Sequence, residues 1–256
     1  MAGMGRLRWS WAVAASMVFC GGAVPVRGQS PTAASPAEVE LFDAIRKGRI
    51  AVRVVPTSYF MVTMTVQNRT RQPLKVNTPE VFAAVATRRL RAWQTASRRG
   101  RSQNDYAPQY DPGGTQSLGG SFYYGDASPG AQSESQPKRK PAEFSLLPGG
   151  RVTVKIPTFC MEFGLPDPNP RIAYTLVPLE VVTRNPAIKK VLAEFGQGKH
   201  HQAVAQLAMW HVANGTPWEK LAQVRWPGNF GRVTPVQLRA ARLLAEQSRR
   251  TSAKTD

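Results

Sequence analysis

The chain has 256 residues with 42% hydrophobic content, which allows one or two packed globular units. Its formal net charge of +18 favours polyanionic partners, such as nucleic acid, anionic polysaccharide or lipid headgroups, and a basic surface with no dedicated ligand is the alternative. After residue 28 no unbroken apolar run reaches the length of a membrane span, so the composition of that part excludes a transmembrane helix.

Residues 1–28 have the three parts of a secretory signal. Arg6 and Arg8 give a positively charged start, Trp11–Val26 is an apolar run too short to span a bilayer easily, and Gly28 ends a small-residue cleavage site. We therefore expect a protein that is secreted, or held in the periplasm or cell envelope, after this segment is cleaved.

Cleavage would change both the charge and the cysteine content. It removes three arginines and no acidic residue, so the formal charge falls from +18 to +15. It also removes Cys20, which leaves Cys160 as the one cysteine of the mature chain. A lone cysteine in an exported protein cannot form an internal disulfide, so its thiol is expected to be buried, paired with another chain, or chemically used.

A short helix is predicted near the start of the mature chain. Ser35 has the side chain of a helix cap, Pro36 suits the first helical position, and Glu38 lies three residues after the cap. Gly48 ends the helix, which we expect to lie over a sheet.

From residue 49 the apolar residues alternate with polar ones, which is the period of a half-buried β-strand. One side of the segment 59–66 is expected to carry Phe60, Val62, Met64 and Val66. Further strands are predicted at 74–77, 81–85, 152–156 and 174–182. Short strands with polar turns between them predict an antiparallel immunoglobulin-like β-sandwich over residues 35–182.

A disordered insertion is predicted inside this sandwich at about residues 90–142. Most of it is rich in Gly, Ser, Gln, Pro and Tyr, a composition that buries too little apolar surface to offset the entropy of ordering. Its tyrosines could stack on bases or sugars, but a solvated spacer is the simpler interpretation. The candidate polyanion-binding residues form a basic run at its start: Arg88, Arg89, Arg91, Arg98, Arg99 and Arg101.

The last third, residues 183–250, is predicted to be a small helical bundle. Asn185–Gly196 has a capped start and apolar residues at helical spacing, and a second helix covers about 200–213. Thr216 and Thr234 each begin a further capped helix. The predicted fold class is therefore α+β, with the sandwich before the bundle.

The residue patterns predict no cofactor and no metal site. His200 and His211 share a helical face with apolar residues, and no second pair of ligands stands at a suitable spacing. Cys160 with a histidine and Asn214 could form a hydrolase triad, because such triads are assembled in space rather than in sequence. The sequence around Cys160 has no known nucleophile signature.

Two segments resemble a known family. They are T-F-C-M-E-F-G-L-P-D-P-N-P with Tyr174, and H-Q-A-V-A-Q-L-A-M-W-H ahead of P-W-E-K-L. Both resemble a family of uncharacterised exported bacterial proteins, and the resemblance covers most of residues 49–225. It implies export and a sandwich with a Gly-rich insert before a small helical domain, and it implies no established activity.

A partial resemblance implies chemistry. Phe159-Cys160 and the helix Gln206-Leu207-Ala208-Met209-Trp210 are similar to bacterial surface thioester domains, which pair an aromatic-Cys segment with a Gln-x-Ala-x-Trp helix. This resemblance implies a covalent adhesin in which the Cys160 thiol condenses with the Gln206 side chain. The candidate neighbours of that bond are Glu162, His211 and Trp210.

Three hypotheses for the function follow. The favoured one is an exported, non-catalytic binding module of the cell envelope or extracellular space, with an unknown ligand. In that case Cys160 is a small buried residue and Trp210 a core anchor. The alternatives are a thioester-forming adhesin module with a Cys160–Gln206 bond, and a cysteine-dependent hydrolase.

Overall fold

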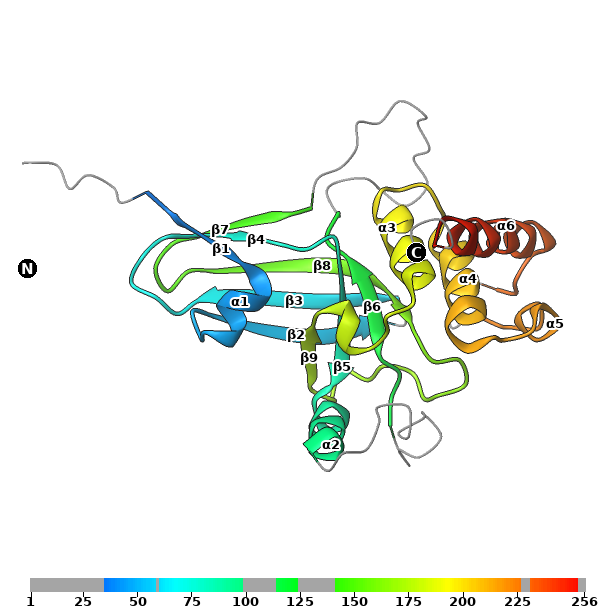
Figure 1. Ribbon diagram of the computed structural model, residues 1–256, viewed down its shortest axis with the longest axis horizontal. Coiled ribbons are helices and arrows are strands. Elements are labelled where there is room, and N and C mark those ends of the chain that lie inside the picture. The colour runs from blue at the N-terminus through cyan, green and yellow to red at the C-terminus, as the bar shows by residue number, and fades with distance from the viewer. Residues whose placement is uncertain (1–34, 59, 99–113, 124–140, 227–230, 253–256) are drawn as a thin grey trace, which may run out of the picture. The chain divides into compact units, whose positions relative to one another are not determined.

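The computed structural model describes residues 35–58, 60–98, 114–123, 141–226 and 231–252 (Figure 1). These residues lie within one compact unit that begins at Ala34. Within them, no helix combines the length and the apolar character needed to cross a membrane. The signal predicted at 1–28 lies outside the described residues, so its cleavage stays a prediction.

Six strands form a closed barrel in which every neighbouring pair is antiparallel. In order around the barrel they are β2 (Ile50–Ser58), β3 (Met61–Asn68), β8 (Arg151–Cys160), β6 (Leu118–Ser121), β5 (Val81–Ala86) and β9 (Tyr174–Val177). The ring closes where Val54 of β2 pairs with Tyr174 of β9. The prediction of an immunoglobulin-like sandwich is therefore wrong, although the α+β mixture of strands and helices is present.

The correction has a physical reason. The predicted alternation is confirmed, because Phe60 just before β3 and Val62, Met64 and Val66 within it are all buried. Alternation only tells which side of a strand is buried, and it is the same in a sandwich and a barrel. The strand that joins β8 to β5 is β6, and its sequence Leu-Gly-Gly-Ser lacks the β-branched and aromatic residues that mark strands.

Strand β6 comes from the stretch in which we expected only a disordered insertion. Its residues are fully buried between β5 and β8. Small residues are required there, since a Cβ on Gly120 would overlap the Phe82 ring and one on Gly119 would lie 3.2 Å from the Leu192 side chain. Residues 99–113 and 124–140 of the expected insertion lie outside the described residues.

A second, three-stranded sheet lies beside the barrel strands in Figure 1. It contains β1 (Ala37–Glu40), β4 (Leu74–Asn77) and β7 (Glu143–Leu146), with β1 parallel to β4 and β7 antiparallel to it. The helix predicted to start at Ser35 is thus shifted, because Ala37–Glu40 forms β1 and α1 covers Leu41–Arg46. Val39 buries its side chain and pairs with Val76, and this pairing outweighs the capping pattern.

The helices after the barrel match the predicted ones closely. They are α3 (Pro186–Gly196), α4 (Gln202–Asn214), α5 (Trp218–Leu221) and α6 (Pro235–Ser252), after the short 3-10 turn η3 (Leu179–Val181). The Asn185 side chain accepts a hydrogen bond from the Ala187 backbone N–H, which caps α3 as expected. Gly215 ends α4 at φ 63°, a left-handed conformation that glycine adopts without strain.

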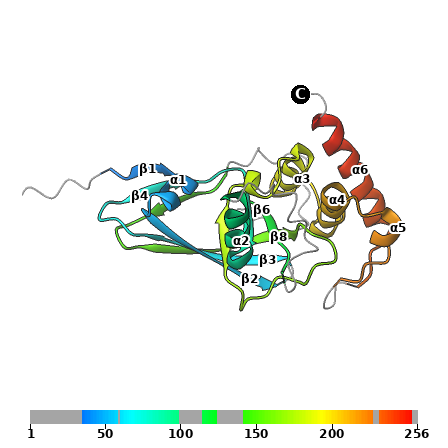
Figure 2. The same cartoon turned by 60° about the horizontal axis from the view of Figure 1, so that its bottom comes forward.

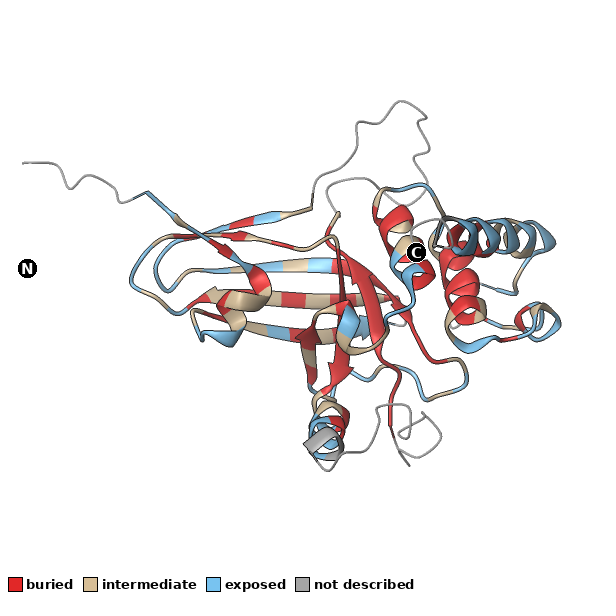
Figure 3. Cartoon of the chain, in the orientation of Figure 1, coloured by how far each residue is buried: buried red, intermediate tan, exposed pale blue. Residues whose placement is uncertain are grey.

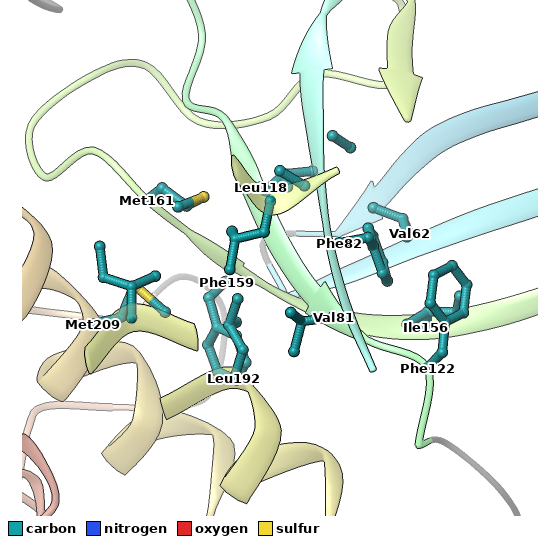
Figure 4. Packing of buried hydrophobic residues seen from close by; sticks show 14 of the residues in the cluster. Val62, Val81, Phe82, Leu118, Phe122, Ile156, Phe159, Met161, Leu192 and Met209 are labelled. Atoms are coloured by element: carbon teal, nitrogen blue, oxygen red, sulfur yellow. The ribbon is translucent and has the colours of Figure 1, made fainter. Parts of the chain in front are cut away.

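The barrel and the helices share one hydrophobic core. Figure 4 shows Phe159 of β8 close to Leu192 of α3 and Met209 of α4. In Figure 3, α3 and α4 are coloured as buried on the side toward the barrel. Phe159 also meets Phe195 edge-on, with their ring centroids 4.5 Å apart. Figure 2 shows α6 on the outer side of α3 and α4. The helices are therefore part of the cover of the barrel.

The tight contact between β6 and β5 gives a test of the barrel. Gly120→Ala places a methyl group in the volume of the Phe82 ring, and we expect the free energy of unfolding to fall by about 1–3 kcal/mol in urea denaturation. Adding Phe82→Leu should restore part of this loss, because the smaller side chain leaves room for the methyl group. Wild-type stability in Gly120→Ala would contradict this placement of β6.

Candidate functional site

The candidate site lies at the end of β8, where Cys160 is the last strand residue. On one side β8 pairs with β3 from Arg151 to Pro157, and on the other it pairs with β6 through Cys160. The last three residues of β8 therefore extend past β3. On that side the Thr158 N–H still donates to the Phe60 C=O at 2.9 Å, whereas the Thr158 C=O and the N–H and C=O of Cys160 need other hydrogen-bond partners.

Two glutamines of α4, one helical turn apart, supply these partners. The Gln206 side chain accepts a hydrogen bond from the Cys160 N–H through Oε1 and donates one to the Cys160 C=O through Nε2, both at 2.8 Å. Gln202 Nε2 donates to the backbone oxygens of Phe60 at 2.7 Å and Thr158 at 3.2 Å. The structure thus brings the predicted pair Cys160 and Gln206 together, and the contact runs through the Cys160 backbone.

The Cys160 thiol is enclosed and held in its neutral form. The residue is 0% exposed, and burial raises the pKa of the thiol well above its usual value. The nearby carboxyl groups of Asp167 and Glu162 raise the pKa further. A thiol is a nucleophile as its thiolate, so this environment suppresses its reactivity.

A buried ion pair lies next to this thiol. Arg89 Nη1 is 2.9 Å from Glu162 Oε1, and Glu162 Oε2 accepts the backbone N–H of Ser117 at 2.6 Å. Arg89 also donates to the Ser117 hydroxyl at 3.2 Å, and its guanidinium lies 4.8 Å from the ring centroid of Trp93. Burial raises the pKa of Glu162, and Arg89 partly offsets that rise. The pair ties α2 (Thr87–Arg98) to the segments around β6 and β8.

Tyr174 extends the polar network at the barrel closure. Its hydroxyl donates to the Gln116 C=O at 3.0 Å, so the Thr115 hydroxyl, 2.6 Å away, acts as donor to the tyrosine oxygen. Burial raises the pKa of Tyr174 to about 12, so the phenol stays neutral at physiological pH. The Gln116 side chain donates to the Leu165 C=O at 3.0 Å. The network therefore joins β9 to the segment before β6.

The residues predicted to neighbour a Cys160–Gln206 bond have different environments. Glu162 contributes electrostatically to Cys160, as described above. His211 Nδ1 lies 2.9 Å from the Thr216 C=O, and its ring stacks on Trp218 with centroids 4.1 Å apart. Trp210 is 2% exposed and packs between Phe163 and Trp226. His211 is thus engaged with the loop and helix that follow α4, and Trp210 with two aromatic rings outside that segment.

The other residues of the predicted hydrolase triad are also engaged elsewhere. His200 lies 3.3 Å from Glu194, and the His201 side chain accepts the Ala203 backbone N–H at the start of α4. Asn214 Oδ1 accepts the Phe163 N–H at 2.9 Å. In the described parts of the chain, no cluster of three or more His, Cys, Asp or Glu is suited to a metal ion.

The predicted polyanion-binding arginines divide into two kinds. Arg88 and Arg91 are exposed on α2, whereas Arg89 is 4% exposed and neutralised by Glu162. The side chain of Arg98, and all of Arg99 and Arg101, lie outside what the structure describes. Sequence reasoning missed the role of Arg89, and it missed Thr115 and Ser117 because they stand in the Gly- and Ser-rich stretch.

Comparison of the chain with protein-family models, curated proteins and solved structures found no match. The interpretation of the site therefore depends on its own geometry. That geometry is a set of buried polar groups where α2, α4 and three barrel strands meet. Most of them are paired with one another, and Gln116 Oε1 and Thr158 Oγ1 are buried without a hydrogen-bond partner.

The buried ion pair gives a test of this interpretation. Glu162→Gln keeps the shape of the side chain but leaves the Arg89 charge buried without its counter-charge, so we expect a loss of about 3–5 kcal/mol in the free energy of unfolding. The double variant Glu162→Gln/Arg89→Met removes both charges and should recover part of that loss.

The exposed pair Lys75–Glu38 is the control for this experiment. Its nitrogen–oxygen distance is 3.0 Å, nearly the same as in the buried pair, but Glu38 is largely exposed. Glu38→Gln should cost at most about 1 kcal/mol. A similar small cost for Glu162→Gln, measured by urea unfolding, would contradict a structural role of the Arg89–Glu162 pair.

Proposed function

We propose that the protein is an exported, non-catalytic binding module of the cell envelope or extracellular space, with anionic ligands. The observation that carries this proposal is the complete burial of Cys160, with its backbone N–H and C=O both bound by the Gln206 side chain. In this proposal Cys160, the residue that suggested a chemical reaction, is part of the packed core. Function is assigned instead to the outer surface of the molecule.

The expectation of export rests on the sequence. The charged start, the apolar run and the small residue at Gly28 are the features of a secretory signal. A single buried thiol suits an exported chain, because burial protects it from oxidation and cross-linking.

The charge of the chain supports an anionic ligand. With Lys and Arg together numbering 34 against 16 acidic residues, the surface field attracts negatively charged polymers. Arg88 and Arg91 are exposed on α2, while Arg89 between them is used inside. We assign the outer side of α2 as one contact region for such a polymer.

Binding to polyphosphate, used as a defined polyanion, tests this function. We expect binding that weakens steeply as salt rises, because each neutralised phosphate releases counterions. Cys160→Ala should bind with unchanged affinity, since the thiol takes no part. Arg88→Ser/Arg91→Ser should reduce the slope of log affinity against log salt by roughly two.

The matched control is Arg53→Ser/Arg151→Ser, which removes two exposed arginines from the barrel strands β2 and β8. It should change the slope less than the α2 variant does. Loss of binding in Cys160→Ala with the fold retained, or equal slopes for the two arginine variants, would contradict the proposed contact region and the passive role of the thiol.

The second candidate is the thioester adhesin, and the Gln206–Cys160 contact favours it. Condensation would form a bond between Cys160 Sγ and Gln206 Cδ and break the Cδ–Nε2 bond, with the thiol proton leaving on ammonia. The Cys160 N–H bound to Oε1 would polarise the carbonyl, as an oxyanion donor does. The raised pKa of the thiol opposes this reaction.

The intact mass of the native protein separates the two candidates. As a binding module, the protein should show the full mass of its chain, and an alkylating reagent at pH about 8.5 should label Cys160 only after unfolding. A thioester would give a mass short by one ammonia. Gln206→Ala should then show the full mass calculated for its own chain, and methylamine should open the bond to a free thiol and an N-methyl amide, one CH2 group heavier than the uncondensed chain. Fast labelling of the folded protein would instead support the hydrolase.

A further inference from the structure

Helix α6 carries an exposed apolar surface of its own. Among the described residues, three large hydrophobic side chains are exposed, namely Leu147, Val236 and Leu243. Val236 is 65% exposed and Leu243 is 67% exposed, and both lie on α6 seven residues apart. Residues at that spacing stand on the same face of a helix.

This face points away from the rest of the molecule. The opposite side of α6 buries Ala241, Leu244 and Ala245, which belong to the shared core. Figure 3 shows that side of the helix buried toward α4 and the outer side exposed. The two exposed apolar side chains therefore have no role in packing α6 against α3 and α4.

Basic residues surround the two apolar side chains. The exposed arginines of the described part of α6 are Arg239, Arg242, Arg249 and Arg250. Its one acidic residue, Glu246, lies 3.8 Å from Arg250 and is neutralised by it. Just before the helix, Arg225 and Arg232 pair across an isolated β-bridge, and both are exposed. Helix α5 adds Lys220 and Glu219, which balance each other in charge.

An aromatic side chain lies beside this face. Trp218 of α5 is half-buried, and the Arg242 guanidinium lies 5.5 Å from its ring centroid. Tryptophan is enriched where proteins meet the interface of a bilayer, because its ring is apolar and its N–H is polar. The outer face of α6, defined here as Val236, Arg239, Arg242 and Leu243, thus combines basic and apolar groups next to a tryptophan.

We propose that the outer face of α6 docks on an anionic phospholipid surface. The arginines bind the lipid phosphates, and Val236 and Leu243 enter the headgroup region, as in interfacial amphipathic helices. A soluble polyanion would use the arginines but leave both apolar side chains in water. A second copy of the same face would bring like charges together. An anionic bilayer complements both properties.

This inference goes beyond the polymer contact at α2 and does not depend on it. The protein would touch the membrane surface through α6 and leave the barrel and α2 free for another ligand. Each arginine near an anionic membrane strengthens binding about fivefold, so the face gives weak, reversible and salt-sensitive attachment.

Vesicle co-sedimentation of the full mature chain tests the proposal. We expect binding to vesicles of phosphatidylglycerol and phosphatidylcholine, and little binding to pure phosphatidylcholine. Arg239→Ser/Arg242→Ser should weaken binding about 25-fold. Leu243→Ser should weaken it about tenfold, through the loss of the inserted side chain. Leu243 is largely exposed, so its replacement should leave thermal stability unchanged.

Two matched controls complete the experiment. Leu147→Ser removes an equally exposed leucine from the turn before β8, and Arg88→Ser/Arg91→Ser removes two exposed arginines from α2; both should bind vesicles like the wild type. Equal effects of the Leu147 and Leu243 variants would overturn the proposal. So would binding to pure phosphatidylcholine as strong as to anionic vesicles, or a dimer in solution that Leu243→Ser dissociates.

Discussion

Backbone hydrogen bonding at the end of β8 is the constraint on which the placement of the helices depends. Strand β8 extends past the end of its neighbour β3. Each buried backbone group left there without a hydrogen bond would cost about 1–3 kcal/mol. Gln202 and Gln206 of α4 fill this need. Four residues of a helix rise about 6 Å, and two residues of a strand rise about 6.7 Å. The spacing between the two glutamines along α4 therefore matches the spacing between Thr158 and Cys160 along β8.

This match fixes α4 against the barrel, and the remaining polar groups complete the joint. The Arg89–Glu162 pair attaches α2 at the same end of the barrel. Tyr174 pairs with Val54 where the ring of strands closes, and its hydroxyl bonds to the segment before β6. At this end of the barrel, buried side chains therefore supply hydrogen bonds to the backbone and neutralise a buried charge. The two contact regions that we propose, on α2 and on α6, lie on the outside and carry exposed arginines.

The sequence predicted elements better than their assembly. Capping residues and apolar spacing predicted the bounds of α3 and α4 to within about two residues, and alternation predicted the buried side of β3. The barrel was missed because β6 is made of small residues, which leave no periodic signal and are explained only by the Phe82 and Leu192 side chains against them. The Cys160–Gln206 pairing came from a resemblance. Its physical basis, an unpaired strand edge, needs the register of β3 and is invisible in one sequence.

Amide hydrogen exchange at the Cys160 N–H tests the central claim most directly. If the Gln206 side chain replaces a strand partner, this N–H should exchange only on global unfolding, as fast as the slowest core amides. Gln206→Met keeps the side-chain volume but removes both hydrogen bonds. In this variant the Cys160 N–H should exchange much faster, through local opening. The core amides of β3 should change only as much as the global stability does. The account would be contradicted if the ratio of the Cys160 N–H exchange rate to that of the β3 core amides were the same in the wild type and in Gln206→Met.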